Sequence, residues 1–465
     1  MVSRREVLKH SGYLMIAKLF VRLVSVPFLI YVAASLGPSL FGVFTFVMAT
    51  VEMVSSLSDF GLSRYGTRVM VREQQDQARF AGILLTLQLF TSVVLALLGL
   101  VVVLIADPSS PKMQVLLLGL LAVVISAFIY TSETIFTATK QFAASAIFSV
   151  AGRLIYLAAG FAALGMGWSV VAVMWAFVAS MVLESVLRMV YAAVKVTPFS
   201  FRFNRYDVRK IAIGTLPFAA TAISALVYFR ADTIILEILK GDTEVGIYGA
   251  AYSFFSFFMW FPIVLSRALL PSLTAGFRDD PEEARLTSWY WYRATGVAGV
   301  AIAFATTVLA GPVIDRLMGE AYADSIPTLQ ILIWTIPPLM MVSMSFNSLT
   351  VCDREKTGAN TSVMAAVMIV AMDFALIPFF GTLGAAAAMV ITTALWEVRM
   401  HWLLVRHMLA PRNALVKTFS MPLVGGVMMA AAALAARPLG TAATLAAGLT
   451  AYTASTLFIR FLERR

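Results

Sequence analysis

Apolar runs of about 20 residues or more, separated by short polar or Gly/Pro segments, recur throughout the sequence, and this pattern restricts the fold more than any other feature. A helix needs about 20 apolar residues to cross the ~30 Å hydrocarbon core of a bilayer. Of the 465 residues, 60% are hydrophobic and 13% are charged, and the mean hydropathy is +0.87. This balance excludes a soluble globular fold and predicts an all-α integral membrane protein.

About fourteen transmembrane helices are predicted from the apolar runs and from the polar, Gly and Pro residues between them. The predicted spans cover residues 13–36, 40–59, 80–106, 113–138, 143–164, 168–194, 211–238, 245–271, 289–314, 325–350, 358–379, 383–407, 417–436 and 440–461. The first run is longer than the apolar segment of a signal peptide and has no convincing cleavage site after it. We therefore expect it to remain as the first helix.

The basic residues are distributed unevenly between the two sides that these spans define. With the N-terminus in the cytoplasm, 26 of the 35 Lys and Arg fall on the cytoplasmic side and four on the opposite side. Cytoplasmic loops of membrane proteins carry such an excess of basic residues. The sequence therefore predicts that both termini are cytoplasmic. The net charge of +10 is then explained by the basic residues of the cytoplasmic loops, and we expect no nucleic-acid partner.

Two turns that lie 204 residues apart share one pattern. Residues 37–44 and 241–248 each read Gly, three variable residues, an apolar residue, Gly, an aliphatic residue and an aromatic one. The offset corresponds to six spans, so the repeat is parallel. It predicts two pseudo-symmetric six-helix lobes plus a C-terminal helix pair, the general plan of alternating-access transporters. The predicted domains are an N-terminal lobe over 1–194, a basic cytoplasmic linker over 195–210, a C-terminal lobe over 211–410, and spans 13 and 14 with the C-terminus over 411–465.

Five basic residues fall inside the predicted spans, where a charge near the bilayer centre costs about 2.5 to 3.5 kcal/mol, and four of them are candidates for the substrate site. These four are Lys18, Arg22, Arg153 and Arg230. Lys18, Arg22 and Arg230 lie 19, 15 and 11 positions before the first glycine of their repeated turn. A spacing of four places them on roughly one face of a shared helical template. We expect this face, with Arg153, to form a cationic cavity that binds the substrate.

Simpler explanations stay open for the same residues. Lys18 could extend its ammonium group to the inner membrane surface. Arg22 could form a buried ion pair with Glu52 in the next span, Arg230 could pair across the bundle, and Arg153 could have a structural role only.

Four carboxylates within the spans are candidates for ion pairs or for binding a coupling ion. They are Glu52, Asp232, Asp373 and Glu397. Asp373 and Glu397, both in the second half, are the better candidates for ion coupling, whereas Glu52 is placed to pair with an arginine.

The sequence lacks the patterns of common catalytic and metal sites. It contains no HExxH, GxSxG or CxxC pattern and no GxxxxGK phosphate-binding loop. Cys352 is the only cysteine, which excludes an intrachain disulfide and a multi-cysteine metal site. We therefore expect no enzymatic activity, no ATP hydrolysis, no metal and no cofactor.

A series of short motifs recurs in order along the chain. It comprises residues 36–42 (LGPSLFG), 58–62 (SDFGL), 230–232 (RAD), 241–248 (GDTEVGIY), 317–322 (LMGEAY) and 377–387 (IPFFGTLGAAA). In order and spacing these motifs resemble those of the Wzx-like polysaccharide and O-antigen flippases of the multidrug/oligosaccharidyl-lipid/polysaccharide (MOP) exporter superfamily. The resemblance covers nearly the whole chain and implies a MATE-like or MOP-like fold.

The resemblance implies transport of an undecaprenyl-pyrophosphate-linked oligosaccharide from the inner to the outer leaflet of a bacterial plasma membrane, by alternating access. The pyrophosphate would be held by the family's basic cavity residues, which map best onto Arg22 and Arg230 and second onto Lys18 and Arg153. Whether a proton, sodium or the membrane potential drives the cycle stays open, and polysaccharide polymerase and glycosyltransferases are candidate partners. Fourteen spans resemble the lipid II flippase branch, in which the last two helices line a path for the lipid tail.

Two other functions stay open. An ion-coupled multidrug exporter of the same superfamily would show an acidic cavity for cationic drugs, and the cations at Lys18, Arg22 and Arg230 argue against it. A membrane glycan polymerase or ligase would carry a sizeable outer loop with catalytic residues, and the short outer loops argue against that.

Overall fold

The structure is a computed structural model that describes residues 4–73, 76–105, 110–201, 205–407, 409, 429, 446–448 and 450–453. Side chains are described from residue 21 onward, except those of residues 22, 205–207, 217, 267, 278, 279 and 281. The predicted spans at 417–436 and 440–461 lie almost entirely outside the described residues. In the described part of the chain every regular element is a helix.

The chain divides by its contacts into two compact units, Met1–Gly249 and Ala250–Arg465, called here the N-terminal and C-terminal units. Elements of the N-terminal unit are α1 (Arg4–Asp59), α2 (Leu62–Arg72), α3 (Gln77–Ile105), α4 (Pro111–Ala138), α5 (Phe142–Gly165), α6 (Val170–Tyr191), the π-helical η2 (Ala192–Val196) and α7 (Arg205–Lys240). Helix α8 (Asp242–Phe258) crosses the boundary. Elements of the C-terminal unit are α9 (Trp260–Asp279), α10 (Pro281–Leu317), η3 (Glu320–Tyr322), α11 (Ser325–Leu332), η4 (Ile333–Thr335), α12 (Ile336–Val351) and α13 (Glu355–Arg406).

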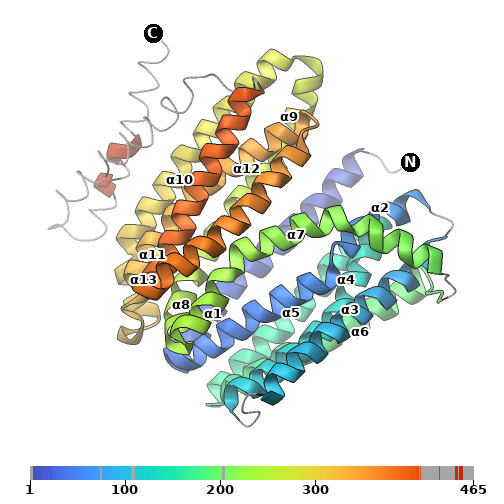
Figure 1. The fold of residues 1–465 in the computed structure, drawn as a ribbon, viewed down its shortest axis with the longest axis horizontal. Helices are drawn as coiled ribbons and strands as arrows, with labels where there is room; N and C mark the ends of the chain where they lie inside the picture. Colours follow the sequence, from blue (N-terminus) through green and yellow to red (C-terminus); the bar gives the residue numbers. More distant parts are fainter. Residues whose placement is uncertain are drawn as a thin grey trace. The chain divides into compact units, whose positions relative to one another are not determined.

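The two longest helices are hairpins. A straight helix of 56 residues, the length of α1, would extend ~84 Å, far more than a bilayer needs. The helical angles of α1 break at Gly37 (φ 72°, ψ 169°), and in Figure 1 its second half returns toward the side where its first half began. Helix α13 breaks at Gly381 in the same way, and a methyl group placed on Gly384 would lie 2.5 Å from the carbonyl oxygen of Leu376. In a straight helix Leu376 and Gly384 would be ~12 Å apart along the axis. Their close approach therefore shows that the chain reverses direction at this break.

Nine of the described helical segments, or ten with the bent α7, are long and apolar enough to cross a membrane. Because the hairpins α1 and α13 each contain two predicted spans, these helices correspond to the first twelve predicted spans. Helix α7 bends by 50° between Leu216 and Phe218, where the sequence has a proline, a residue that lacks the backbone N–H of a regular helix. The prediction of an all-α membrane fold is confirmed, and the predicted count of fourteen spans stays a prediction.

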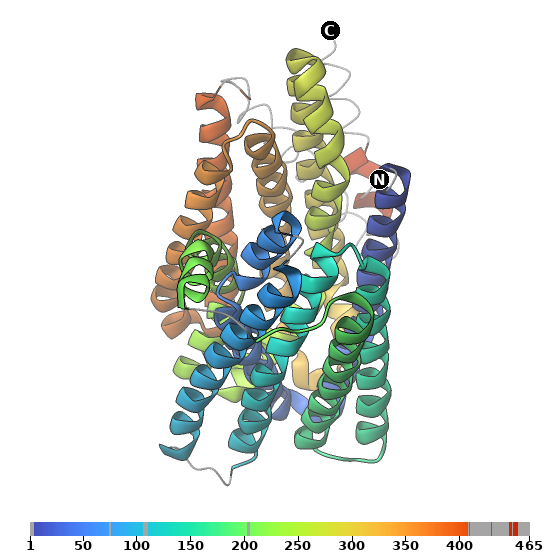
Figure 2. The same ribbon diagram turned by 90° about the vertical axis from the view of Figure 1, so that its right-hand side faces the viewer.

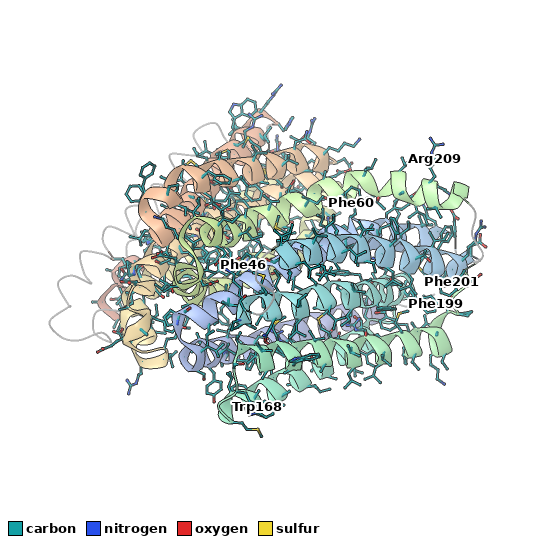
Figure 3. The ribbon with its side chains drawn as sticks, turned by 60° about the horizontal axis from the view of Figure 1, so that its bottom comes forward. Phe46, Phe60, Trp168, Phe199, Phe201 and Arg209 are labelled. Atoms are coloured by element: carbon teal, nitrogen blue, oxygen red, sulfur yellow. The ribbon has the colours of Figure 1, made fainter. Side chains whose placement is uncertain are left out.

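Within the N-terminal unit the helices run alongside one another. Helix α4 packs against α3 and α6, and α6 packs against α5, as the cyan to green helices of Figure 2 show. Figure 3 shows Trp168, in the turn after α5, at the opposite end of this unit from Phe201 and Arg209 of the basic linker. The predicted outer turn and the predicted cytoplasmic linker are therefore on opposite ends of the same helices.

Helix α7 belongs to the N-terminal unit because it packs against α1 and α2. The division at Gly249 therefore lies beyond the predicted linker at 195–210. The predicted lobes rest on the sequence repeat, and their boundaries stay predictions.

Candidate substrate-binding site

Arg230 and Glu52 form an ion pair between two membrane-spanning helices. The Nη2 atom of Arg230 on α7 lies 2.6 Å from Oε2 of Glu52 on the second half of α1. Counted at 1.5 Å per residue, Arg230 lies ~16 Å and Glu52 ~22 Å from the turns at Gly241 and Gly37. A helical side chain leans toward the N-terminus of its helix, so the long arginine reaches the level of the carboxylate.

The exposure of this pair indicates which surroundings it faces. The side chain of Glu52 is 54% exposed and that of Arg230 is 22% exposed, although both lie well inside their spans. A charged group at this depth is rarely turned toward lipid and instead faces a bundle interior or a water-filled space. The pair is therefore placed where a polar substrate could reach it.

Arg153 on α5 is directed at the first half of α1. Its Nε atom donates to Oγ of Ser25 at 2.8 Å, and its guanidinium carbon lies 5.2 Å from the centre of the Tyr156 ring. Ser25 follows Arg22 by three positions, so both lie on one face of α1. These contacts show how Arg153 can join α5 to α1, and they bring it beside the helix face that carries Arg22.

The side chains of Lys18 and Arg22 lie outside the described residues, although the backbone of α1 passes through both positions. Their predicted part in the cavity stays a prediction. The ion pair considered from sequence between Arg22 and Glu52 is likewise untested, and the partner that Glu52 does show is Arg230.

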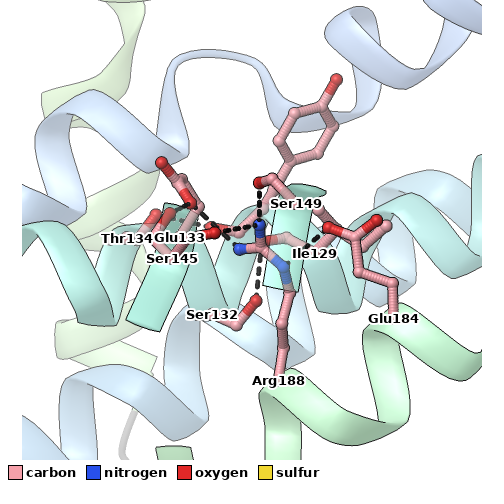
Figure 4. Close-up of polar contacts among 9 residues, drawn as sticks. Ile129, Ser132, Glu133, Thr134, Ser145, Ser149, Glu184 and Arg188 are labelled. Atoms are coloured by element: carbon pink, nitrogen blue, oxygen red, sulfur yellow. Dashed lines mark hydrogen bonds and ion pairs between the residues drawn. The ribbon is translucent and has the colours of Figure 1, made fainter. Parts of the chain in front are cut away.

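Arg188 lies at the centre of an ionic cluster in the N-terminal unit, shown in Figure 4. Its Nε atom lies 2.8 Å from Oε1 of Glu184, and its Nη1 atom lies 3.0 Å from Oε2 of Glu133. Its Nη2 atom donates to the carbonyl oxygen of Ser145 at 3.2 Å and to the hydroxyl of Ser149. The arginine therefore joins α4, α5 and α6. From sequence, Glu184 and Arg188 look like an ordinary helix pair with i,i+4 spacing, and nothing local reveals that Glu133 joins them.

Asp232 on α7 is fully buried, as expected for a carboxylate deep in a span. One oxygen accepts hydrogen bonds from the backbone nitrogen of Thr233 at 2.6 Å and from its hydroxyl at 3.1 Å, and the other accepts from Tyr248 on α8. These bonds tie α7 to α8. Its predicted part in ion coupling stays a prediction.

Asp373 and Glu397 on α13 are both fully buried. Glu397 accepts a hydrogen bond from the hydroxyl of Tyr292 on α10, and that hydroxyl lies 3.1 Å from Nδ1 of His401. Sequence reasoning selected both carboxylates but missed Tyr292 and His401 as neighbours of Glu397. Within the described residues, no group of three or more His, Cys, Asp or Glu is arranged to hold a metal ion.

The two repeated turns meet each other. A methyl group on Gly42 would overlap the carbonyl oxygen of Asp242, and one on Gly246 would overlap the carbonyl oxygen of Pro38. Adding the repeat offset of 204 to Pro38 and Gly42 gives Asp242 and Gly246, so the two contacts are related by the internal symmetry. The glycine that opens each turn also has a positive φ, which is 72° at Gly37 and 86° at Gly241. The repeat is therefore a structural repeat, and its glycines allow two helices to cross at backbone contact.

Lys112, at the start of α4, joins this crossing. Its Nζ atom lies 2.8 Å from Oδ1 of Asp242 and also forms an ion pair with Glu237 near the end of α7. It further lies 5.3 Å from the centre of the Phe46 ring. Nothing in the sequence pointed to this cluster, because Lys112 is more than a hundred positions away from both of its acidic partners.

Comparison with models of known protein families identifies the family of this chain. The family described as polysaccharide biosynthesis protein matches residues 7–277, more than half of the sequence. The chain belongs to this polysaccharide biosynthesis protein family. A comparison with curated proteins finds no significant relative.

The fold of this polysaccharide biosynthesis protein is similar to solved structures of transporters. With the lipid II flippase MurJ in an inward closed conformation the TM-score is 0.79 at 13% identity, over 97% of this chain and 99% of that chain. With the inward-facing conformation of a multidrug resistance MATE family transporter of the MOP superfamily it is 0.68 at 16% identity, over 84% and 98%. With a MOP superfamily transporter from Pyrococcus furiosus it is 0.54 at 16% identity, over 87% and 95%. The predicted MOP-like fold is confirmed, and the polysaccharide biosynthesis protein is a multi-pass membrane protein.

Proposed function

We propose that the protein is a flippase that moves an undecaprenyl-pyrophosphate-linked oligosaccharide from the cytoplasmic to the outer leaflet of a bacterial plasma membrane by alternating access. The product would supply polysaccharide, O-antigen or exopolysaccharide biosynthesis. One observation carries the proposal. A chain of the polysaccharide biosynthesis protein family follows, over 97% of its length, the fold of a lipid II flippase.

The charges of the N-terminal unit fit an anionic headgroup. A pyrophosphate carries negative charges that an arginine guanidinium can bind through two parallel hydrogen bonds. Arg230 is held by Glu52 at 2.6 Å in a half-exposed pair, so an incoming pyrophosphate could take the place of the carboxylate. Arg22 and Lys18 on α1, together with Arg153 on α5, would add positive charge.

The remaining parts of the proposal follow from the same function. Both termini lie in the cytoplasm, and the protein itself performs no covalent chemistry. Polysaccharide polymerase and glycosyltransferases act on the same lipid-linked glycan before or after it crosses the membrane, and they are the partners we expect.

The test is the leaflet in which the lipid-linked glycan resides in cells depleted of the protein. An impermeant probe added from outside labels only glycan in the outer leaflet. We expect labelling to fall on depletion, to return with the wild-type protein, and to stay low with Arg22→Ala inserted at normal level. If labelling persists while the glycan stays unpolymerised, the protein acts after translocation as a polymerase or ligase. If the glycan is unaffected but cells become sensitive to cationic drugs, it is a multidrug exporter.

A further inference from the structure

Glu397, Tyr292 and His401 form a buried polar cluster in the C-terminal unit. All three side chains are at most 2% exposed. The hydroxyl of Tyr292 donates to Oε1 of Glu397 and lies 3.1 Å from Nδ1 of His401. Glu397 and His401 are four positions apart on α13 and therefore share a helix face. The ring of Trp289 stacks on Tyr292 at 5.2 Å and covers the cluster from α10.

Each end of this hydrogen-bonded chain has a polar atom without a partner. Among the described residues, Oε2 of Glu397 and Nε2 of His401 are buried and make no hydrogen bond. Buried polar atoms in proteins are nearly always hydrogen-bonded, so two orphaned atoms at the ends of one chain call for an explanation. A mobile proton that is bound either at Glu397 or at His401 would explain both atoms.

Among the described residues, Glu397 takes part in no ion pair. Helices α11 and α12 and the η4 turn pack against α13 and contain no charged residue. On α10, Arg293 follows Tyr292 and has an interaction partner of its own. On α13 itself, Arg399 lies 4.4 Å from the ring of Trp402. Asp373 lies ~12 Å and Glu397 ~24 Å from the turn at Gly381, so the two carboxylates are at different depths.

A carboxylate buried without a cation is too costly to remain charged, so Glu397 is expected to hold a proton in this state. A metal ion is a poor alternative, because hard cations such as sodium prefer a shell of oxygen ligands and an imidazole supplies nitrogen. Histidine is instead the side chain whose ordinary titration range lies nearest neutrality. The donor set therefore fits a proton better than a metal.

We propose that Glu397, Tyr292 and His401 form a proton relay, and that the proton bound at Glu397 is the ion coupled to transport, an inference that rests on the proposed flippase function. A proton arriving at Nε2 of His401 makes an imidazolium, whose Nδ1 proton passes to Tyr292 as the hydroxyl proton of Tyr292 passes to Oε1 of Glu397. One proton enters, the carboxylate becomes neutral, the tyrosine is restored, and His401 ends as its other neutral tautomer. Release follows the same path in reverse.

The position of the relay suits exchange with one side of the membrane. His401 lies ~30 Å from the turn at Gly381, which is about the thickness of the hydrocarbon core. Its Nε2 atom is therefore the end of the relay that lies nearer the predicted cytoplasmic surface, and Glu397 lies deeper.

The first test needs no substrate. Infrared difference spectra report the C=O stretch of a protonated carboxyl group. They are recorded on the purified full chain over the pH range in which carboxyl and imidazole groups titrate. We expect a band that Glu397→Gln removes, that Tyr292→Phe shifts, and that Glu355→Gln leaves unchanged. Glu355 is the control because it is an exposed glutamate on the same helix. Absence of any band sensitive to Glu397→Gln would overturn the relay whether or not the protein is a flippase.

The second test measures coupling in vesicles that contain the lipid-linked glycan. A gradient of one pH unit coupled to one proton per cycle drives about a tenfold transbilayer accumulation. We expect this accumulation with the wild type and with Glu355→Gln, and its loss with Glu397→Gln. A tenfold accumulation that survives Glu397→Gln would overturn the coupling role. If the wild type does not flip the glycan at all, the proposed function fails, and the infrared titration still decides whether the relay exists.

Discussion

Exchanging the charges of Arg230 and Glu52 separates a substrate-binding arginine from an ion pair that only holds two helices together. Three variants form the series, namely Arg230→Ala, Glu52→Gln and the double swap Glu52→Arg with Arg230→Glu. If the pair only joins α1 and α7, both single variants should be equally damaging and the swap should restore function. If Arg230 binds pyrophosphate, Glu52→Gln should be tolerated and the swap should not rescue.

The expected magnitudes follow from the geometry. Glu52 is 54% exposed, so solvent screening limits the contribution of the pair to stability to about 0–1 kcal/mol, and we expect all variants to insert and fold. A charge-assisted hydrogen bond to a phosphate contributes about 1.5–3 kcal/mol. Losing it in Arg230→Ala should lower transport about 10- to 150-fold. In the swap the cation moves from α7 to α1, and transport should stay low.

The assay is the rate at which lipid-linked glycan appears in the outer leaflet of reconstituted vesicles, normalised to the inserted protein. Thermal unfolding of the same variants in detergent checks the fold. Recovery of wild-type transport by the double swap, or equal losses in Arg230→Ala and Glu52→Gln, would refute the reasoning that Arg230 contacts the substrate.

Two further predictions concern the packing that positions the site, and thermal unfolding in detergent tests both. Gly42→Ala should destabilise the protein by about 1–3 kcal/mol, because its methyl group would overlap a backbone carbonyl, whereas Gly311→Ala has nothing within 4 Å and should be neutral or slightly stabilising. Equal effects of the two would contradict a close helix crossing. Arg188→Met should cost about 3–5 kcal/mol, because it strands two acidic partners in the bundle, while Arg285→Met, which breaks an exposed pair, should change little. A mild effect of Arg188→Met would show that the cluster is solvated.

Much of the fold could be predicted because a single physical constraint dominates it. Each span must be apolar and about 20 residues long, so the first twelve spans could be read from composition alone. The turns at Gly37 and position 241 were also readable, since glycine marks the positive φ that each turn requires. The structure adds that these turns touch each other, a contact across 204 residues that the local pattern does not encode.

The candidate site was only partly predictable. Selecting charged residues inside spans found Arg230, Glu52 and Glu397, because the cost of burying a charge makes such residues conspicuous in a sequence. Their partners could not be found in this way. Tyr292 is 105 positions from Glu397, and a tyrosine in an apolar run looks like an ordinary packing residue. Pairing depends on which helices lie side by side, and periodicity within one helix does not carry that information.

The central claim is translocation of a lipid-linked glycan, and reconstitution of the purified full chain into vesicles with undecaprenyl-pyrophosphate-linked oligosaccharide on both leaflets tests it most directly. An impermeant glycan-modifying enzyme is added outside. The proposed function predicts that nearly all of the glycan becomes accessible when the wild type is present, that only the outer half does in protein-free vesicles, and that Arg230→Ala reaches full accessibility about 10- to 150-fold more slowly. Accessibility that stops at half with the wild type would contradict the claim.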